Sequence, residues 1–137
     1  MKKIVVGYDG SEQAAAAFKY ALDLAEKYKA ELLVVSVARP PEPPEMVETE
    51  AMLENARDHF KKGFAALRAQ ADAVKVVAHF SVVVGSPADQ IIHHANEQKA
   101  DLIVLGHRGK SRVKRWLLGS VSRRVTSYAS CSVLIVR

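Results

Sequence analysis

The stretch "KKIVVGYDGS" (residues 2–11) contains the signal of a strand followed directly by the start of a helix. Residues 2–8 form a short run rich in β-branched side chains, and Asp9, Gly10 and Ser11 interrupt it. Beyond this break, apolar side chains recur at the spacing of an amphipathic helix; they are Ala14, Ala17, Ala21, Leu24 and Tyr28. Asp9 or Ser11 can cap its first amides. The stretch therefore predicts a strand, a tight turn and a helix.

The same alternation continues to the end of the chain. Residues 31–37, "ELLVVSV", have too few polar positions for a half-exposed strand and suit one covered on both faces. Further strands are predicted at 74–84, 101–106 and 132–137, and further helices at 47–71, from Ser86 onward and at about 117–129. "RPPEPPE" (39–45) predicts an extended loop because proline lacks the amide and fixes φ.

The third helix has a well-marked beginning. Ser86 suits the N-cap, Pro87 stands where a missing amide does no harm, and Asp89 is placed to reach back to the cap.

Strands alternating with helices predict a single α/β domain over residues 1–137. The expected architecture is a doubly wound (Rossmann-like) five-stranded parallel sheet flanked by four helices. In such sheets ligands bind beyond the carboxyl ends of the strands, where the strand order reverses. If the first and fourth strands are neighbours at that point, Asp9 and Gly106 face one crevice.

Composition limits the class of protein. The chain has 137 residues, 49% of them hydrophobic and 26% charged, and contains no apolar run of 18 that could span a bilayer. Only three apolar residues lie between the two lysines and Gly7, which is too few for a signal peptide, so we expect a cytoplasmic protein. The one cysteine, Cys131, has no partner for an internal disulfide and suits a small buried apolar role.

Charge is unevenly distributed along the chain. The first 101 residues carry 12 Lys and Arg against 15 Asp and Glu, a net charge of −3, whereas the remainder carries eight basic residues and no acid. This asymmetry indicates an anionic partner for the C-terminal part.

A glycine pattern lies within the basic part. "GHRGKSRVKRWLLGS" (106–120) places Gly106 and Gly109 before a basic run and Gly119 and Ser120 at the start of a helix. Glycines allow a backbone to approach phosphate closely, and the free amides and dipole of a helix N-terminus favour an anion. The pattern predicts a polyphosphate site, to which Ser120 and Ser122 can add hydroxyl groups and Arg108 a positive charge.

Two other phosphate motifs do not fit. The "GKS" at 109–111 suggests a P-loop, but that motif needs a further glycine where the chain has Val104. The dinucleotide fingerprint is absent because "GYDGSE" (7–12) has the wrong spacing.

The spacing Gly106, Gly109, Gly119, Ser120 resembles the ATP-binding signature of the universal stress protein family. The segments "VVGYDGSE", "GSPADQII", "ADLIVLG" and "CSVLIV" resemble that family in the same order and extend the likeness over nearly the whole chain.

The resemblance assigns roles to residues. It implies that Gly7, Tyr8 and Asp9 line the adenosine side, that the backbone of Val37 meets the adenine, and that Asp9 lies near the ribose and a phosphate-bound Mg²⁺. It also implies which residues hold the phosphates: Gly106, Gly109, Gly119, Ser120 and Val121, with Ser122 nearby. Relatives dimerise by antiparallel pairing of the last strand, so a homodimer is expected, and a sheet edge rich in β-branched residues is itself prone to pairing.

Two classes of function remain open for this site. The first is a regulatory protein that binds ATP or another adenine nucleotide, with AMP and a cyclic form left open, and signals to an unknown protein partner through conformation or assembly. The second is a slow ATP-hydrolysing enzyme using the same site, for which Asp9 is the only candidate general base. Nucleic-acid binding is less favoured, because aromatic residues are not interleaved with the basic ones. His93 and His94 are adjacent on a helix and do not share a face as a metal pair would.

Overall fold

The computed structural model describes residues 1–40, 49–108 and 118–137. Its elements follow in the order β1 (Lys3–Gly7), α1 (Glu12–Tyr28), β2 (Glu31–Ala38), α2 (Thr49–Ala73), β3 (Ala78–Val84), α3 (Pro87–Glu97), β4 (Leu102–Gly106), α4 (Ser120–Tyr128) and β5 (Ser132–Val136). All strand pairs are parallel, and the sheet order is β3-β2-β1-β4-β5. The predicted doubly wound α/β fold with four helices is confirmed.

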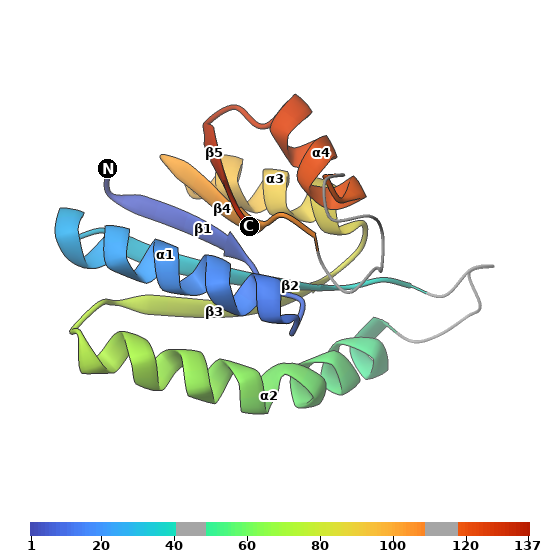
Figure 1. Ribbon diagram of the computed structural model, residues 1–137. Coiled ribbons are helices and arrows are strands. Elements are labelled where there is room, and N and C mark those ends of the chain that lie inside the picture. The colour runs from blue at the N-terminus through green and yellow to red at the C-terminus, as the bar shows by residue number, and fades with distance from the viewer. Residues whose placement is uncertain (41–48, 109–117) are drawn as a thin grey trace.

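The sheet lies between two layers of helices (Figure 1). On one face, Ile4 and Val6 of β1 pack with Phe18 of α1 and Leu67 of α2. On the other face, Val5 packs in a second core with α3 and α4. Since successive side chains of a strand point to opposite faces, the apolar run of β1 supplies both cores.

The strand order reverses between β1 and β4. Val6 lies opposite Val104 in the register of this pair, so the carboxyl ends of the two strands are adjacent. The crevice predicted at Asp9 and Gly106 is therefore at the switch point of the sheet.

Helix α1 is capped as its sequence predicts. The Ser11 side chain accepts a hydrogen bond from the Ala14 amide at 3.1 Å. Asp9 Oδ1 accepts the Ser11 amide at 2.9 Å and fixes the turn before the helix. At the other end, Lys29 adopts the left-handed conformation with φ 55°.

Three predicted boundaries are wrong. The third strand begins at Ala78, four residues later than predicted, because the chain makes a turn in which Lys75 has φ 58° and the Val74 amide donates to the Ala71 carbonyl. Helix α2 continues to Ala73, and helix α4 begins at Ser120, since the backbone of Gly119 is extended at ψ 156°.

No helix of the described ranges is both long and apolar enough to cross a membrane.

Candidate functional site

A cavity of about 390 Å³ opens at the switch point of the sheet. Its wall combines the ends of β1, β2 and β4 with the beginnings of α1, α3 and α4 and with one side chain of α2. The lining residues are Gly7, Tyr8, Asp9, Ser11, Ala14, Val35, Val37, Arg39, Phe60, Pro87, Ile91, Leu105, Gly106, Arg108, Gly119, Ser120, Val121 and Ser122.

Ten of the eleven residues predicted for the site line this cavity. They are Gly7, Tyr8, Asp9, Val37, Gly106, Arg108, Gly119, Ser120, Val121 and Ser122. The eleventh, Gly109, lies outside the described residues, as do the basic side chains of 110–115 and Trp116. Residues more than a hundred positions apart in sequence thus share one wall.

One end of the cavity is the N-terminus of α4. The first bond inside this helix runs from the Arg123 amide to the Gly119 carbonyl at 2.9 Å. The amides of Ser120, Val121 and Ser122 precede it, so none has a carbonyl partner within the described part of the chain. Gly119, the N-cap, supplies no side-chain acceptor. Free amides and the positive end of the helix dipole make this end suited to an anion.

The motif glycines contribute by allowing close packing. A Cβ on Gly106 would lie 2.9 Å from the backbone carbon of Gln13, so this glycine lets the start of α1 approach the end of β4. The amide of Gly119 donates to the His107 carbonyl at 3.0 Å and is not free for a ligand. The glycine pattern predicts a free amide at Gly119, and the structure differs on this point. The amides left for an anion are those of residues 120–122.

Ser122 has a hydroxyl group that is already engaged. Its Oγ donates to the Gly106 carbonyl at 2.8 Å, and the residue is 4% exposed. This bond fixes the start of α4 against the end of β4. Of the two serine hydroxyls considered for phosphate binding, that of the exposed Ser120 remains without a partner among the described residues.

Arg108 supplies a cation at the same end. A Cβ on Gly119 would lie 3.3 Å from Arg108 Cα and 3.5 Å from its Cγ, so the arginine passes closely over the N-cap of α4. Its Nη1 atom is buried and has no hydrogen-bond partner among the described residues. Leaving a buried donor unpaired costs about 1–3 kcal/mol, so an anion that reorients this guanidinium recovers that energy.

The other end of the cavity is apolar and aromatic. The Tyr8 ring contacts those of Phe60 and Phe64, with centroids 6.4 Å and 6.1 Å away. The Tyr8 backbone is fixed by its amide, which donates to the Val35 carbonyl at 2.9 Å, and by its carbonyl, which accepts the buried Ser36 hydroxyl. This end suits an apolar ring system, in contrast to the anion-binding end.

Asp9 follows β1, which lies between β2 and β4 in the sheet. One of its carboxylate oxygens is held by the Ser11 amide, and the other has no hydrogen bond to the described residues. Within the described ranges no group of three or more His, Cys, Asp or Glu could hold a metal ion. A single carboxylate still fits Mg²⁺, which is commonly bound through one or two carboxylates together with substrate phosphates.

Sequence reasoning missed eight lining residues. They are Ser11, Ala14, Val35, Arg39, Pro87, Ile91, Leu105 and Phe60. Arg39 could have been found, because it directly follows β2 at the edge where ligands bind. Phe60 could not have been found from the sequence, because its helical spacing indicates only that it belongs to the packed face of a helix. Which part of α2 reaches the cavity depends on how α2 packs against the sheet.

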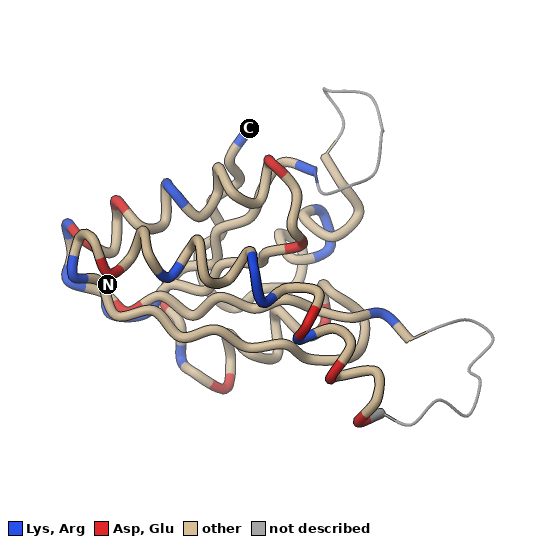
Figure 2. Tube along the Cα trace, turned by 90° about the horizontal axis from the view of Figure 1, so that it is seen from below, with Lys and Arg blue, Asp and Glu red and all other residues tan. Residues whose placement is uncertain are grey.

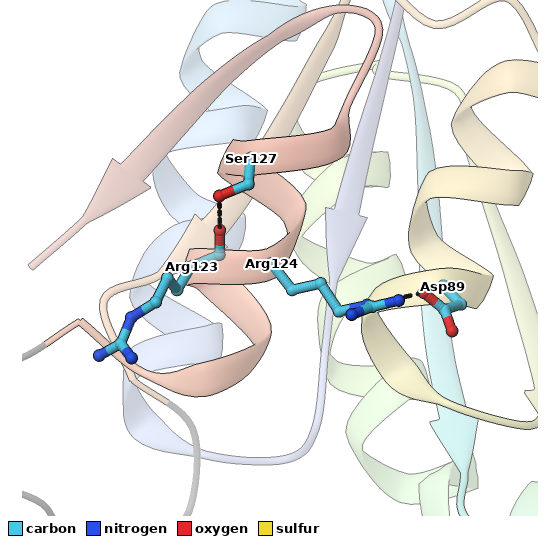
Figure 3. A network of polar contacts seen from close by, with 4 residues as sticks. All are labelled: Asp89, Arg123, Arg124 and Ser127. Atoms are coloured by element: carbon cyan, nitrogen blue, oxygen red, sulfur yellow. Dashed lines mark hydrogen bonds and ion pairs between the residues drawn. The ribbon is translucent and has the colours of Figure 1, made fainter.

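An ion pair joins α3 and α4, the two helices whose first residues line the cavity. Arg124 Nε donates to Asp89 Oδ1 at 2.9 Å, linking α4 to α3 (Figure 3). Among the described residues Asp89 accepts a side-chain hydrogen bond only from Arg124, so the predicted bond back to the N-cap does not form, and the Ser86 side chain caps no amide either. Both side chains are more than half exposed, so the pair adds little stability but restrains two helices that line the site. Figure 2 shows basic and acidic positions on the same tube, and among the described residues all acidic positions belong to the part of the chain up to Asp101.

Comparison with known proteins agrees with this geometry. The sequence model of the Universal stress protein family matches residues 1–137. The universal stress protein MJ0531 of Methanocaldococcus jannaschii is 35% identical over 143 residues, covering 99% of this chain and 82% of the relative.

Solved structures show the same likeness. The universal stress protein UspA from Lactobacillus plantarum superposes with a TM-score of 0.83 at 26% identity, covering 99% of this chain and 97% of that one. A universal stress protein solved in complex with cAMP superposes with a TM-score of 0.78 at 27% identity, covering 99% and 97%. The whole length of the sequence and its fold thus lead to one assignment: the chain belongs to the universal stress protein family.

Proposed function

We propose that this protein binds ATP in the cavity at the switch point and acts as a regulatory protein in the stress response. The observation that carries the proposal is the division of one cavity into two ends. The free amides of 120–122 and the Arg108 guanidinium line the side formed by β4 and α4, whereas Val37 and Phe60 line the side formed by β2 and α2, where the Tyr8 ring contacts Phe60. A ligand with an aromatic base and a phosphate chain matches both ends. The related structure with bound cAMP supports an adenine nucleotide as the ligand class.

In this arrangement the phosphates accept hydrogen bonds from the start of α4, and the adenine packs near the backbone of Val37. Charge-assisted hydrogen bonds contribute about 1.5–3 kcal/mol each, so three or four of them are sufficient for about micromolar affinity after the cost of association. Asp9 would hold Mg²⁺ together with the phosphates. Mg²⁺ would neutralise phosphate charge and orient the chain of phosphates.

Binding is favoured over hydrolysis. Among the described lining residues Asp9 is the only carboxylate, and one of its oxygens is held by the Ser11 amide. A general base must be placed to activate water, and an Asp9 that serves Mg²⁺ or the ribose is not available for that role. Single-turnover measurement should therefore show no release of ADP or AMP above the uncatalysed rate.

Calorimetry tests the proposal directly. We expect titration of the purified protein with ATP and Mg²⁺ to give a dissociation constant of about micromolar order. Parallel titrations with ADP, AMP and cAMP show how the dissociation constant depends on the number of phosphates and on whether the nucleotide is cyclic. Absence of binding by all four nucleotides would disprove the proposal.

Assembly and location follow from the same proposal. β5 is an edge strand whose Val133, Leu134 and Ile135 are only half-buried, and we infer that two copies pair through it as family members do. Sedimentation at micromolar concentration should give the mass of a dimer, and a monomer would contradict this. We infer a cytoplasmic location, a compartment in which ATP is abundant.

A further inference from the structure

A second surface lies at the opposite edge of the sheet. β3 pairs only with β2 in the described sheet, so the backbone groups on its outer side have no strand neighbour there. The strand has seven residues, "AHFSVVV", without proline or lysine, and six of the seven are half-buried. Proteins commonly protect such edges with lysine, proline or a bulge, because a free edge pairs readily with another strand.

A groove of about 580 Å³ runs beside this edge, between α2 and β3. Figure 1 shows α2 lying along β3 at the margin of the molecule. The apolar part of the groove comes from Phe64, Ala65 and Ala69 of α2 and from Phe80 and Val82 of β3. The rings of Phe64 and Phe80 pack with centroids 5.0 Å apart, so this floor is built from the folded core.

The charged rim of the groove is mainly basic. Arg57, Lys61 and Arg68 line it, and none of them forms an ion pair with a carboxylate of the described residues. The Arg68 guanidinium lies 4.6 Å from the centre of the Phe80 ring, which holds its charge over the groove. Asp58 and Asp72 also line the groove, leaving one net positive charge.

We propose that the edge of β3 and this groove bind an acidic, extended segment of a partner protein. The segment would add a strand beside β3 through main-chain hydrogen bonds, as in other cases of strand addition. Its apolar side chains would pack on Phe80 and Val82, and its acidic side chains would pair with Lys61 and its basic neighbours. The groove shares no lining residue with the nucleotide cavity, although Phe64 of the groove also contacts the Tyr8 ring of that cavity.

The charges favour this occupant over two others. A second copy of the chain would bring an identical groove, in which Arg57, Lys61 and Arg68 outnumber Asp58 and Asp72, so two surfaces of net positive charge would meet. A nucleic acid backbone would meet Asp58 and Asp72 and could not use the strand edge.

A peptide titration tests the proposal in the absence of nucleotide. The probe is an octapeptide of alternating glutamate and valine, added to the full-length protein and followed by amide-resolved NMR. We expect shift changes at Ala78–Val84 and in α2 beside the groove, and weaker binding at high salt. The same peptide with alternate N-methylated amides, which cannot pair as a strand, should not bind. Shift changes that leave β3 unaffected, or equal binding by the N-methylated peptide, would overturn the proposal.

Matched variants of α2 test the charge. Lys61→Glu should weaken binding of the acidic peptide about fivefold, because an attractive charge becomes a repulsive one. Lys62→Glu is the control, since Lys62 is equally exposed on the same helix but does not line the groove. A valine-lysine peptide should bind Lys61→Glu better than the wild type. Equal effects of the two variants, or equal affinity for acidic and basic peptides, would also overturn the proposal.

Because these titrations contain no nucleotide, their result is independent of the calorimetry with ATP. Failure of the peptide to bind leaves ATP binding intact, and failure of ATP to bind leaves the groove intact.

Discussion

The amide of Gly119 donates a hydrogen bond to the carbonyl of His107 at 3.0 Å. This bond brings the end of β4 to the N-cap of α4, so that Arg108 lies against the helix start whose amides are free. Gly119 therefore positions the start of α4 beside Arg108, and its own amide is not available to the proposed ligand.

Gly119→Ala should lower the affinity for ATP and change the stability of the fold only slightly. The backbone of Gly119 has φ −62°, which alanine adopts readily, but the new Cβ would lie 3.3 Å from Arg108 Cα. We expect displacement of Arg108 to weaken ATP binding about tenfold, because one charge-assisted hydrogen bond is lost. The free energy of unfolding should change little. Calorimetry and urea unfolding measure the two effects. Ser127→Ala, on the same helix away from the cavity, is the control, and equal ATP affinity in both variants would count against this role.

Gly63→Ala tests the role of Tyr8 in the cavity through a residue that does not itself line the cavity. A Cβ at this position in α2 would lie 2.8 Å from Tyr8 Oη, so the tyrosine ring must move. Alanine is favoured over glycine in a helix by about 1 kcal/mol, so stability should hold or rise while ATP affinity falls. Tyr8→Phe in the same background removes the hydroxyl and should restore part of the affinity. Unchanged affinity in Gly63→Ala would show that Tyr8 does not shape the ligand site.

Gly7→Ala should destabilise the fold. The new Cβ would lie 2.6 Å from Leu105 Cδ2 and 2.9 Å from Ile91 Cδ1, both in the buried core. Overpacking of this kind costs about 1–3 kcal/mol in the free energy of unfolding. The double variant with Leu105→Val should lose less than the sum of the two single changes, because valine removes the closest atom. Strict additivity in urea unfolding would contradict the predicted contact.

Acid should weaken the fold partly through Asp101. Its Oδ2 accepts the amides of Lys2 and Lys3 at 2.7 Å and 3.0 Å, and these bonds hold the pKa of this carboxyl below its usual value. The folded state thus favours the charged carboxylate. The resulting stability is present above the unfolded pKa of about 3.9 and is lost as the pH falls through the lower folded value.

Asp101→Asn should therefore be less stable than the wild type at neutral pH, with a difference that shrinks below about pH 4. Urea unfolding across this range measures it. Asp23→Asn is the control, because Asp23 is exposed and accepts no hydrogen bond from the described residues. A pH-independent difference for Asp101→Asn would show that the bonds to Lys2 and Lys3 do not depend on charge.

The sequence predicted the fold well because each strand and helix has its own local signal. The apolar run of β1, the Ser11 cap and the Pro87 start each specify an element without reference to the rest of the chain. The turn after α2 was missed because Lys75 adopts a left-handed conformation that usually calls for glycine or asparagine. No residue type at that position marks the end of the helix.

The site was predicted in position but not in detail. Asp9 and Gly106 line one cavity, as expected if the first and fourth strands are neighbours, and the structure supplies that pairing, which the alternation of elements alone does not determine. That the Gly119 amide and the Ser122 hydroxyl are used within the protein depends on loop geometry that spacing does not encode. Phe60 enters the cavity only through the packing of α2, which is a tertiary feature.

An NMR titration with ATP and Mg²⁺ tests the central claim most directly, because it resolves individual amides. The amides of Ser120, Val121 and Ser122 should shift furthest, together with those of Gly7, Tyr8 and Asp9, and Arg108→Ala should weaken the titration about tenfold. Shifts confined to other parts of the molecule, or none at millimolar ATP, would contradict the account.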